Sequence, residues 1–178
     1  MSFKEFIKTE VRPAVMKEMS LKNQFEVPNV VKVVLNVGAG EAVSNKGSIA
    51  KIQEQLGMIA GQKAVVTKAR RSVSAFKIRQ GLPIGVKVTL RGERMYSFLH
   101  KMITIVLPRL RDFRGIDHSC VDGHGNLNVG FTEQTLFPEI EYDKIDKLRG
   151  LQVTVVTTAR NHAKGKLFFE KLGVLFKK

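Results

Sequence analysis

Three stretches of this sequence combine residue types that could do chemistry. The first, Asp117–His124, gathers two histidines, one cysteine and two aspartates within eight residues. His118, Cys120 and His124 are possible zinc ligands, but the Cys-x2-Cys pair typical of zinc modules is missing. A polar turn with a partly buried Cys120 is the simpler interpretation, so the sequence predicts no metal site.

The second stretch is Gly38-Ala39-Gly40, which follows a buried-strand pattern and invites a nucleotide-binding interpretation. A dinucleotide-binding fold needs a third glycine where Val43 stands. A phosphate-binding P-loop needs Gly-Lys-Ser/Thr, whereas the order here is Lys46-Gly47-Ser48. Glycines that let the backbone turn sharply, close to a phosphate, fit better. No nucleophile elbow with a carboxylate placed to orient a base is visible, so we predict neither an enzyme nor a cofactor.

The third stretch is the middle of the chain, where the positive charge is concentrated. The 178 residues carry a formal net charge of +14. Between residues 61 and 114, thirteen Lys and Arg stand against only Glu93 and Asp112. Such a stretch repels itself unless a polyanion lies against it. The charges extend over predicted strand, loop and helix, not along one amphipathic helix with apolar anchors, which favours nucleic acid over a membrane.

Aromatic side chains suited to stacking on single-stranded bases are sparse. The chain has no Trp and two Tyr, and its Phe residues fall mostly on predicted core faces. This pattern favours a folded RNA recognised through its backbone and shape. No helix-turn-helix, basic zipper or zinc finger indicates DNA. A single Cys120, a charged N-terminus and the lack of a long apolar run favour a soluble, cytoplasmic protein without a membrane partner.

Hydrophobic periodicity predicts the elements that must position these residues. Ser2 and Glu5 form a capping box for an N-terminal helix, which Pro13 kinks or restarts. Further helices are predicted at 48–60 with Gly61 after the end, at 95–106, and after an Asn161 cap through Leu172. Strands are predicted at 30–37, 64–67, 84–91, 126–131 and 151–158.

The connections between these elements include two long polar segments. Residues 68–85 are predicted to form an exposed basic arm or loop, and 134–149 a surface excursion. Several strands alternate apolar with polar residues, and neither a linker nor a repeat divides the chain. We therefore predict an α+β fold in one domain over 1–178. It has a mainly antiparallel sheet with helices on one face, an N-terminal helical segment at 1–22 and the basic arm.

Long blocks of the chain are similar to a known family. The run 59–72 reads IAGQKAVVTKARRS and continues at 73–92 as VSAFKIRQGLPIGVKVTLRG. Further blocks are VKVVLNVG at 31–38, LPRLRDFRG at 107–115 and GNLNVGFTEQTLFPEI at 125–140. In this order, from about residue 24 to the C-terminus, they resemble the bacterial ribosomal large-subunit protein L5 family.

The resemblance implies a structural ribosomal protein that binds 5S rRNA and helps attach it to the large-subunit rRNA in the central protuberance. The residues that it implies for rRNA binding are Asn36, Gly38, Gly40, Ser44, Gln62, Lys63, Thr67, Lys68, Arg70, Arg71 and Arg91. Those implied for the P-site tRNA are Ser72, Ser74, Lys77, Arg79 and Gln80. Those implied for a bridge to a small-subunit head protein are Arg109, Arg111, Asp112, Arg114, Glu139 and Glu141.

The resemblance also implies contacts with neighbouring large-subunit proteins. An alternative from another class stays open on the residues alone. It is a small RNA-processing enzyme or metalloenzyme that uses His118, Cys120 and His124.

Overall fold

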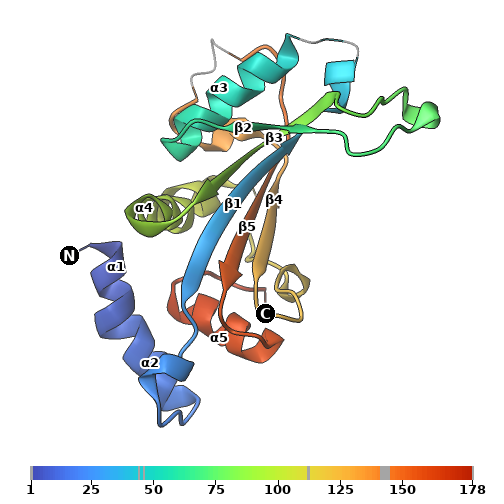
Figure 1. Ribbon diagram of the computed structural model, residues 1–178. Coiled ribbons are helices and arrows are strands. Elements are labelled where there is room, and N and C mark those ends of the chain that lie inside the picture. Colours follow the sequence, from blue (N-terminus) through green and yellow to red (C-terminus); the bar gives the residue numbers. More distant parts are fainter. Residues whose placement is uncertain (1, 44, 46, 112, 141–144, 178) are drawn as a thin grey trace. The chain divides into compact units, whose positions relative to one another are not determined.

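The computed structural model describes residues 2–43, 45, 47–111, 113–140 and 145–177 (Figure 1). Its helices are α1 (Phe3–Phe6), α2 (Arg12–Glu18), α3 (Ser48–Ala60), α4 (Gly92–Lys101) and α5 (His162–Lys171). Its strands are β1 (Val30–Gly38), β2 (Val65–Lys68), β3 (Pro83–Leu90), β4 (Leu127–Phe131) and β5 (Leu151–Thr157). Each predicted helix and strand is thus present; α3 has the predicted ends, and the other elements are shifted at one end or both.

The strands of the described chain form one sheet in the order β2-β3-β1-β5-β4. β2 pairs antiparallel with β3, with Val65 opposite Lys87 and Thr67 opposite Gly85. A Cβ at Gly85 would lie 2.9 Å from Thr67 Oγ1, so only glycine fits beneath that side chain without a shift. The predicted α+β class with a mainly antiparallel sheet is confirmed.

The chain divides into two compact units, each built from separate segments of the sequence. Unit 1 comprises residues 1–33, 90–129 and 154–178. Unit 2 comprises residues 34–89 and 130–153. β1, β3, β4 and β5 contribute residues to both units, because the boundaries fall within these strands.

Unit 1 contains the N-terminal helical segment. Ser2 Oγ accepts a hydrogen bond from the backbone N–H of Glu5, and the Glu5 carboxylate accepts one from the backbone N–H of Ser2. This is the predicted capping box. A π-helical turn over Ile7–Val11 leads into α2, whose first turn holds Pro13. Pro13 therefore lies in the first turn of the new helical segment, as one of the two predicted outcomes for this residue. α1 packs against α4, and α2 packs against α5.

Unit 2 contains α3, β2 and the arm between β2 and β3. Ile52 and Leu56 bury one face of α3, and Gly61 ends it in the left-handed conformation at φ +61°. Gly61 meets this requirement without the strain of a side chain. The amide of Gln53 then donates to the Ala64 carbonyl oxygen at 2.7 Å, which fixes the link from α3 to β2.

Two predictions for the connections are wrong. β3 begins at Pro83, so 83–85 belong to a strand and the arm between strands covers 69–82. Proline is tolerated at the first residue of a strand, which explains the earlier start. Residues 134–140 are not a surface excursion, because Gln134, Thr135, Phe137 and Ile140 are buried. The rings of Phe131 and Phe137 meet edge-on, with centroids 5.6 Å apart.

Candidate nucleic-acid interface

The arm of unit 2 is a hydrogen-bonded ribbon that extends from the ends of β2 and β3 (Figure 1). At its base, the Ala69 N–H donates to the Leu82 carbonyl at 2.8 Å. Near its tip, Val73 and Ile78 exchange backbone hydrogen bonds of 2.9 and 3.1 Å. A 3-10 turn over Ser74–Phe76 closes the ribbon. The predicted exposed arm therefore has a defined conformation in the free chain.

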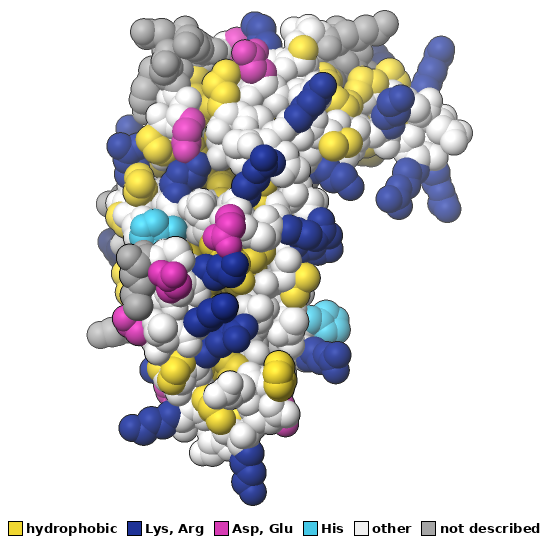
Figure 2. Space-filling model, turned by 60° about the vertical axis from the view of Figure 1, so that its left-hand side comes forward, with side chains coloured by type: hydrophobic (Ala, Val, Ile, Leu, Met, Phe, Trp, Pro, Cys, Tyr) yellow, Lys and Arg dark blue, Asp and Glu magenta, His cyan; other side chains and the backbone are white. Residues whose placement is uncertain are grey.

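A row of exposed cations follows β2, the arm and β3. We define the basic strip as Lys63, Lys68, Arg70, Arg71, Lys77, Arg79 and Lys87, all of which belong to unit 2 and are exposed. Within the described part of the chain, none of these seven side chains forms an ion pair or a hydrogen bond. Lys and Arg also outnumber acidic side chains on the face that Figure 2 shows.

The strip has no acidic residues to neutralise it along its own sequence. No Asp or Glu occurs between Glu54 and Glu93. Seven exposed cations on one continuous segment produce a positive potential that attracts polyanions and releases their counterions on binding. The electrostatic pattern predicted from the sequence is therefore present on the surface of unit 2.

Polar and small residues of β1 and β2 complete this surface. Asn36 is exposed on β1, in the alternating pattern that buries Leu35 and Val37. Thr67 is half-buried above Gly85. Gln62 Nε2 donates to the Thr89 carbonyl oxygen at 3.4 Å, which positions this amide beside Lys63. These side chains can hydrogen-bond sugar or base edges next to the phosphates that the cations would bind.

Gly38 and Gly40 lie in an open environment after β1. Ala39 between them is buried, and its N–H donates to the Ile84 carbonyl at 2.9 Å. Neither glycine has φ in the left-handed range, and a Cβ added to either would meet no atom of the described residues within 4 Å. The turn itself therefore does not require glycine. Because the two glycines have no side chains, the space over their backbone is open and a ligand can approach it closely.

A second charged group in unit 2 is neutralised within the chain. We define the neutralised cluster as Glu41, Lys51, Asp146, Lys147 and Arg149, in which both carboxylates are paired with cations; Lys51 Nζ lies 3.5 Å from Asp146. Arg149 Nε binds Glu41 at 2.7 Å and its Nη1 binds Asp146 at 2.8 Å, while Lys147 Nζ lies 2.7 Å from Glu41. Hydrogen bonds from Lys147 and Arg149 lower the pKa of Glu41, and those from Arg149 hold the pKa of Asp146 far below its usual range.

The cluster has a consequence for the turn after β1. Glu41 is the next residue after Gly40, and a free carboxylate there would repel a phosphate near the open glycines. Lys147 and Arg149 cancel this charge. They thereby leave the turn compatible with an anionic ligand.

Sequence reasoning missed the residues that hold this cluster in place. The side chain of Gln134 is buried; its Oε1 accepts from the Arg149 N–H, and its Nε2 donates to the Lys147 carbonyl at 2.8 Å. Gln134 therefore fixes the backbone that presents Lys147 and Arg149. The only signal in the sequence was a polar residue, Gln134, shortly before the apolar Phe137. Its partners, Lys147 and Arg149, lie 13 and 15 residues further on, so the pairing could not be predicted.

The remaining predicted site residues are distributed as follows. Arg91 follows β3, belongs to unit 1 and is exposed before the first turn of α4. Arg109, Arg111 and Arg114 are exposed in unit 1, whereas Glu139 is half-buried in unit 2. Ser72, Ser74 and Gln80 are exposed on the arm. Ser44, Asp112 and Glu141 lie outside the described residues.

The Asp117–His124 stretch of unit 1 uses its polar groups to build turns. Asp117 accepts from the backbone N–H and hydroxyl of Ser119, which lowers the pKa of Asp117. Burial raises the pKa of Asp122, but hydrogen bonds from Asn126 and His124 outweigh it and lower that pKa. Among the described residues, no three His, Cys, Asp or Glu lie close enough to hold a metal ion.

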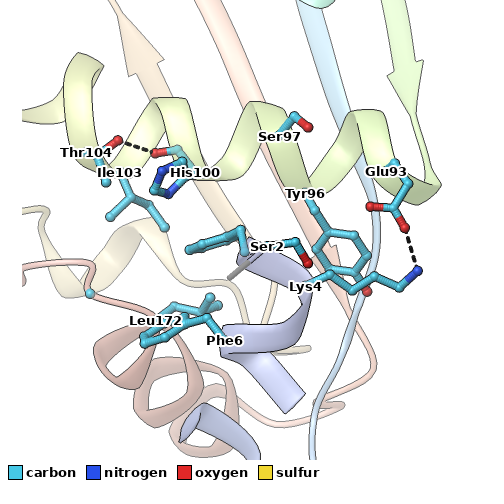
Figure 3. A pocket seen from close by; sticks show the side chains of 12 residues that line it. Ser2, Lys4, Phe6, Glu93, Tyr96, Ser97, His100, Ile103, Thr104 and Leu172 are labelled. Carbon is cyan, nitrogen blue, oxygen red and sulfur yellow. Dashed lines mark hydrogen bonds and ion pairs between the residues drawn. The ribbon is translucent and has the colours of Figure 1, made fainter. Parts of the chain in front are cut away.

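A hollow of about 680 Å³ in unit 1 is the other concave site of note (Figure 3). Phe6, Ile103 and Leu172 give it an apolar lining, and an ion pair between Lys4 and Glu93 lies at one end. The hydroxyl of Thr104 donates to the His100 carbonyl oxygen. We assign no reaction to this hollow; the Lys4–Glu93 ion pair joins α1 to α4, and the Thr104 bond lies within one helical stretch.

Family models match most of the chain in two adjoining parts. The model described as Ribosomal protein L5 matches residues 23–79, and the model of the C-terminus of the same ribosomal family matches residues 83–176. No helix among the described residues has the length and apolar character to cross a membrane. An antiparallel α+β fold with an exposed cationic strip, matched in this way, defines the class: a protein of the ribosome.

Similar chains agree over nearly the full length. The "Large ribosomal subunit protein uL5" of Roseiflexus sp. (strain RS-1) is 52% identical over 98% of this chain and 97% of its own. That of Prochlorococcus marinus (strain MIT 9215) is 49% identical over 100% and 99%, and that of Dictyoglomus thermophilum is 52% identical over 95% and 94%. The chain belongs to the ribosomal protein L5 family, whose members here are structural proteins of the large ribosomal subunit.

Proposed function

We propose that this chain binds folded 5S rRNA through unit 2 and helps attach it to the large-subunit rRNA in the central protuberance. The basic strip carries the proposal, because its seven exposed cations have no ion-pair partner among the described residues. The open backbone at Gly38 and Gly40 and the amides of Asn36 and Gln62 add contacts of the kind that position an RNA backbone.

The arm has a separate role in this proposal. Lys77 and Arg79 near its tip contact the P-site tRNA, while Lys68, Arg70 and Arg71 near its base, and Lys63 in the link from α3 to β2, bind 5S rRNA. The arm is ordered by its own hydrogen bonds, so its tip can hold cations at a fixed distance from the base. Segments 108–115 and 133–142 meet a small-subunit head protein. The exposed Arg109, Arg111 and Arg114 support the first of these contacts.

The experiment that tests the rRNA function is a filter-binding titration of 5S rRNA at several salt concentrations. The variant K63A/K68A/R70A/R71A removes four cations that lie outside the core. We expect at least about a hundredfold weaker binding near physiological salt and a shallower salt dependence, since each phosphate contact contributes a slope of about 0.7–0.9. Its unfolding free energy should stay within about 0.5 kcal/mol of wild type.

The matched control removes the same charge from unit 1. K8A/K17A/K22A/K164A also lowers the net charge by four, and its first three side chains are exposed. It should bind 5S rRNA within a fewfold of wild type. Equal losses in the two variants would show that binding follows net charge alone, and the proposed interface would then be wrong.

A further inference from the structure

Phe76 at the tip of the arm is an exposed aromatic side chain. It is 72% exposed, and its ring stacks on no other ring in the described part of the chain. The sequence pattern places Phe residues mostly on core faces, as Phe137 and Phe168 are, and Phe76 is one of the exceptions. Leaving a large ring in water is unfavourable, so a ligand that covers it would gain free energy.

The backbone around Phe76 is held in place. Phe76 ends a 3-10 turn, and the N–H of Lys77 donates to the Ser74 carbonyl oxygen at 3.0 Å. Lys77 itself has φ of +53°, a left-handed conformation that Gly or Asn adopts more easily. A lysine at this position keeps a cation beside the ring despite the backbone cost, which is a reason to look for function here.

Residues on either side of Phe76 in the sequence line a hollow, and Lys77 and Arg79 among them are cationic. An open hollow of about 770 Å³ beside the turn is lined by Ser72, Ser74, Lys77, Ile78, Arg79 and Gln80. No carboxylate occurs on the arm. Cations and hydroxyls suit phosphate and sugar oxygens, whereas an exposed ring suits the flat face of a base. One nucleotide presents all of these groups together.

We propose that Phe76 stacks on an unstacked nucleobase of a folded RNA while Lys77 and Arg79 bind the adjacent phosphates. The arm tip would then recognise two features of the RNA. One is the phosphate charge, and the other is a base whose face is not covered by neighbouring bases. This inference rests on the proposed contact between the arm and the P-site tRNA. Stacking contributes a term that salt screens little, unlike the phosphate contacts.

The experiment uses large subunits reconstituted with variant chains and joined to small subunits, and measures P-site tRNA dissociation constants at two salt concentrations. F76A removes the ring, F76L keeps an apolar side chain without a π face, and F76W keeps a stacking face. We expect F76A and F76L to weaken tRNA binding about 5- to 100-fold with unchanged salt dependence, and F76W to retain it. F25A is the matched control, because Phe25 is 97% exposed in unit 1.

The variant K77A/R79A separates this inference from the proposed function. Should K77A/R79A weaken tRNA binding while F76A does not, the arm contacts tRNA but Phe76 does not stack, and the inference is overturned. Equal binding by F76L and wild type would overturn it as well, since an apolar contact would suffice. If K77A/R79A and F76A both bind like wild type, the arm–tRNA contact itself is wrong.

An independent reading comes from the free chain. The sequence has no tryptophan, so F76W carries the only indole group in the protein. We expect its fluorescence to fall when tRNA is added, because stacking on a base quenches indole emission, and the emission of F25W to change much less. The same quenching in both variants would count against a specific stack at Phe76.

Discussion

Unit 2 contains two groups of cations, one that forms ion pairs and one that does not among the described residues. In the neutralised cluster, Arg149 is 9% exposed and pairs with Glu41 and Asp146. In the basic strip, every cation is exposed and makes no ion pair among the described residues. The difference shows that the chain pairs the cations of the cluster with carboxylates, whereas the sequence from residue 55 to residue 92, which contains the strip, has no Asp or Glu. Cations that have partners stabilise the protein, and those without partners are available to a ligand.

The largest expected effect is a difference in unfolding free energy between a variant of the neutralised cluster and a variant of the basic strip. Replacing Arg149 by Met leaves Glu41 and Asp146 without their shared partner and removes a nearly buried guanidinium. We expect R149M to lower the unfolding free energy by about 2–3 kcal/mol, measured by urea titration. R71M, which removes an exposed arginine from the strip, should change it by less than about 0.5 kcal/mol. Similar losses in both variants would contradict the distinction.

The open glycines offer a second test, which separates ligand approach from folding. A methyl group at Gly38 or Gly40 would have no described atom within 4 Å beyond its neighbours in the chain, but it would occupy space that the proposed rRNA backbone needs. G38A and G40A should therefore keep wild-type stability and bind 5S rRNA about tenfold more weakly, about 1.4 kcal/mol in binding free energy. G123A is the control, since Gly123 is equally open within unit 1. Unchanged affinity in G38A and G40A would remove these glycines from the interface.

Acid should weaken the cluster and leave the strip intact. The folded-state pKa values of Glu41 and Asp146 lie below their ordinary values of 4.5 and 3.8. Their ion pairs therefore stabilise the fold above those values, and this contribution is lost as the pH falls through and below them. We expect a loss on the order of 1–2 kcal/mol between pH 5 and pH 3 that is smaller in E41Q/D146N. An identical pH profile in that variant would mean that other carboxylates are responsible.

The smallest effect concerns the strained residue at the arm tip. K77G relieves the left-handed conformation of Lys77, so its unfolding free energy should stay equal or rise by up to about 1 kcal/mol. The same change removes a cation of the strip, so P-site tRNA binding by ribosomes carrying K77G should weaken. If K77G is as stable as wild type but binds tRNA less tightly, Lys77 serves ligand binding and not the stability of the fold. A K77G chain with full tRNA binding would oppose it.

Local signals predicted the fold well. Asn161 caps α5 by accepting from the Ala163 N–H, and Gly61 ends α3, because caps depend on neighbours within a few residues. The concentration of positive charge in the middle of the chain could also be predicted, since Lys and Arg are counted directly in the sequence. Whether the chain acts as one domain over 1–178 stays a prediction, as do the individual rRNA, tRNA and bridge residues.

The sequence could not predict interactions between residues far apart along the chain. Glu41 and Arg149 are separated by 108 positions, and Gln134 holds Arg149 through a buried amide. Without these partners, the charges of 134–149 resemble a solvated loop, which is why the burial of Gln134, Thr135, Phe137 and Ile140 was missed. The chain does turn after β1, but the spacing of Gly38 and Gly40 could not reveal that neither has a left-handed φ, because spacing does not reveal backbone angles.

The backbone hydrogen bonds along the arm have a kinetic consequence. Ala69 with Leu82 and Val73 with Ile78 hold the ribbon before any partner arrives. Ordering a flexible loop of this length would otherwise oppose association by about 1 kcal/mol or more for each residue fixed. A contact made by a rigid probe needs little intrinsic strength to form, so it can also be released quickly. Such a tip suits a partner that comes and goes many times during the life of one particle.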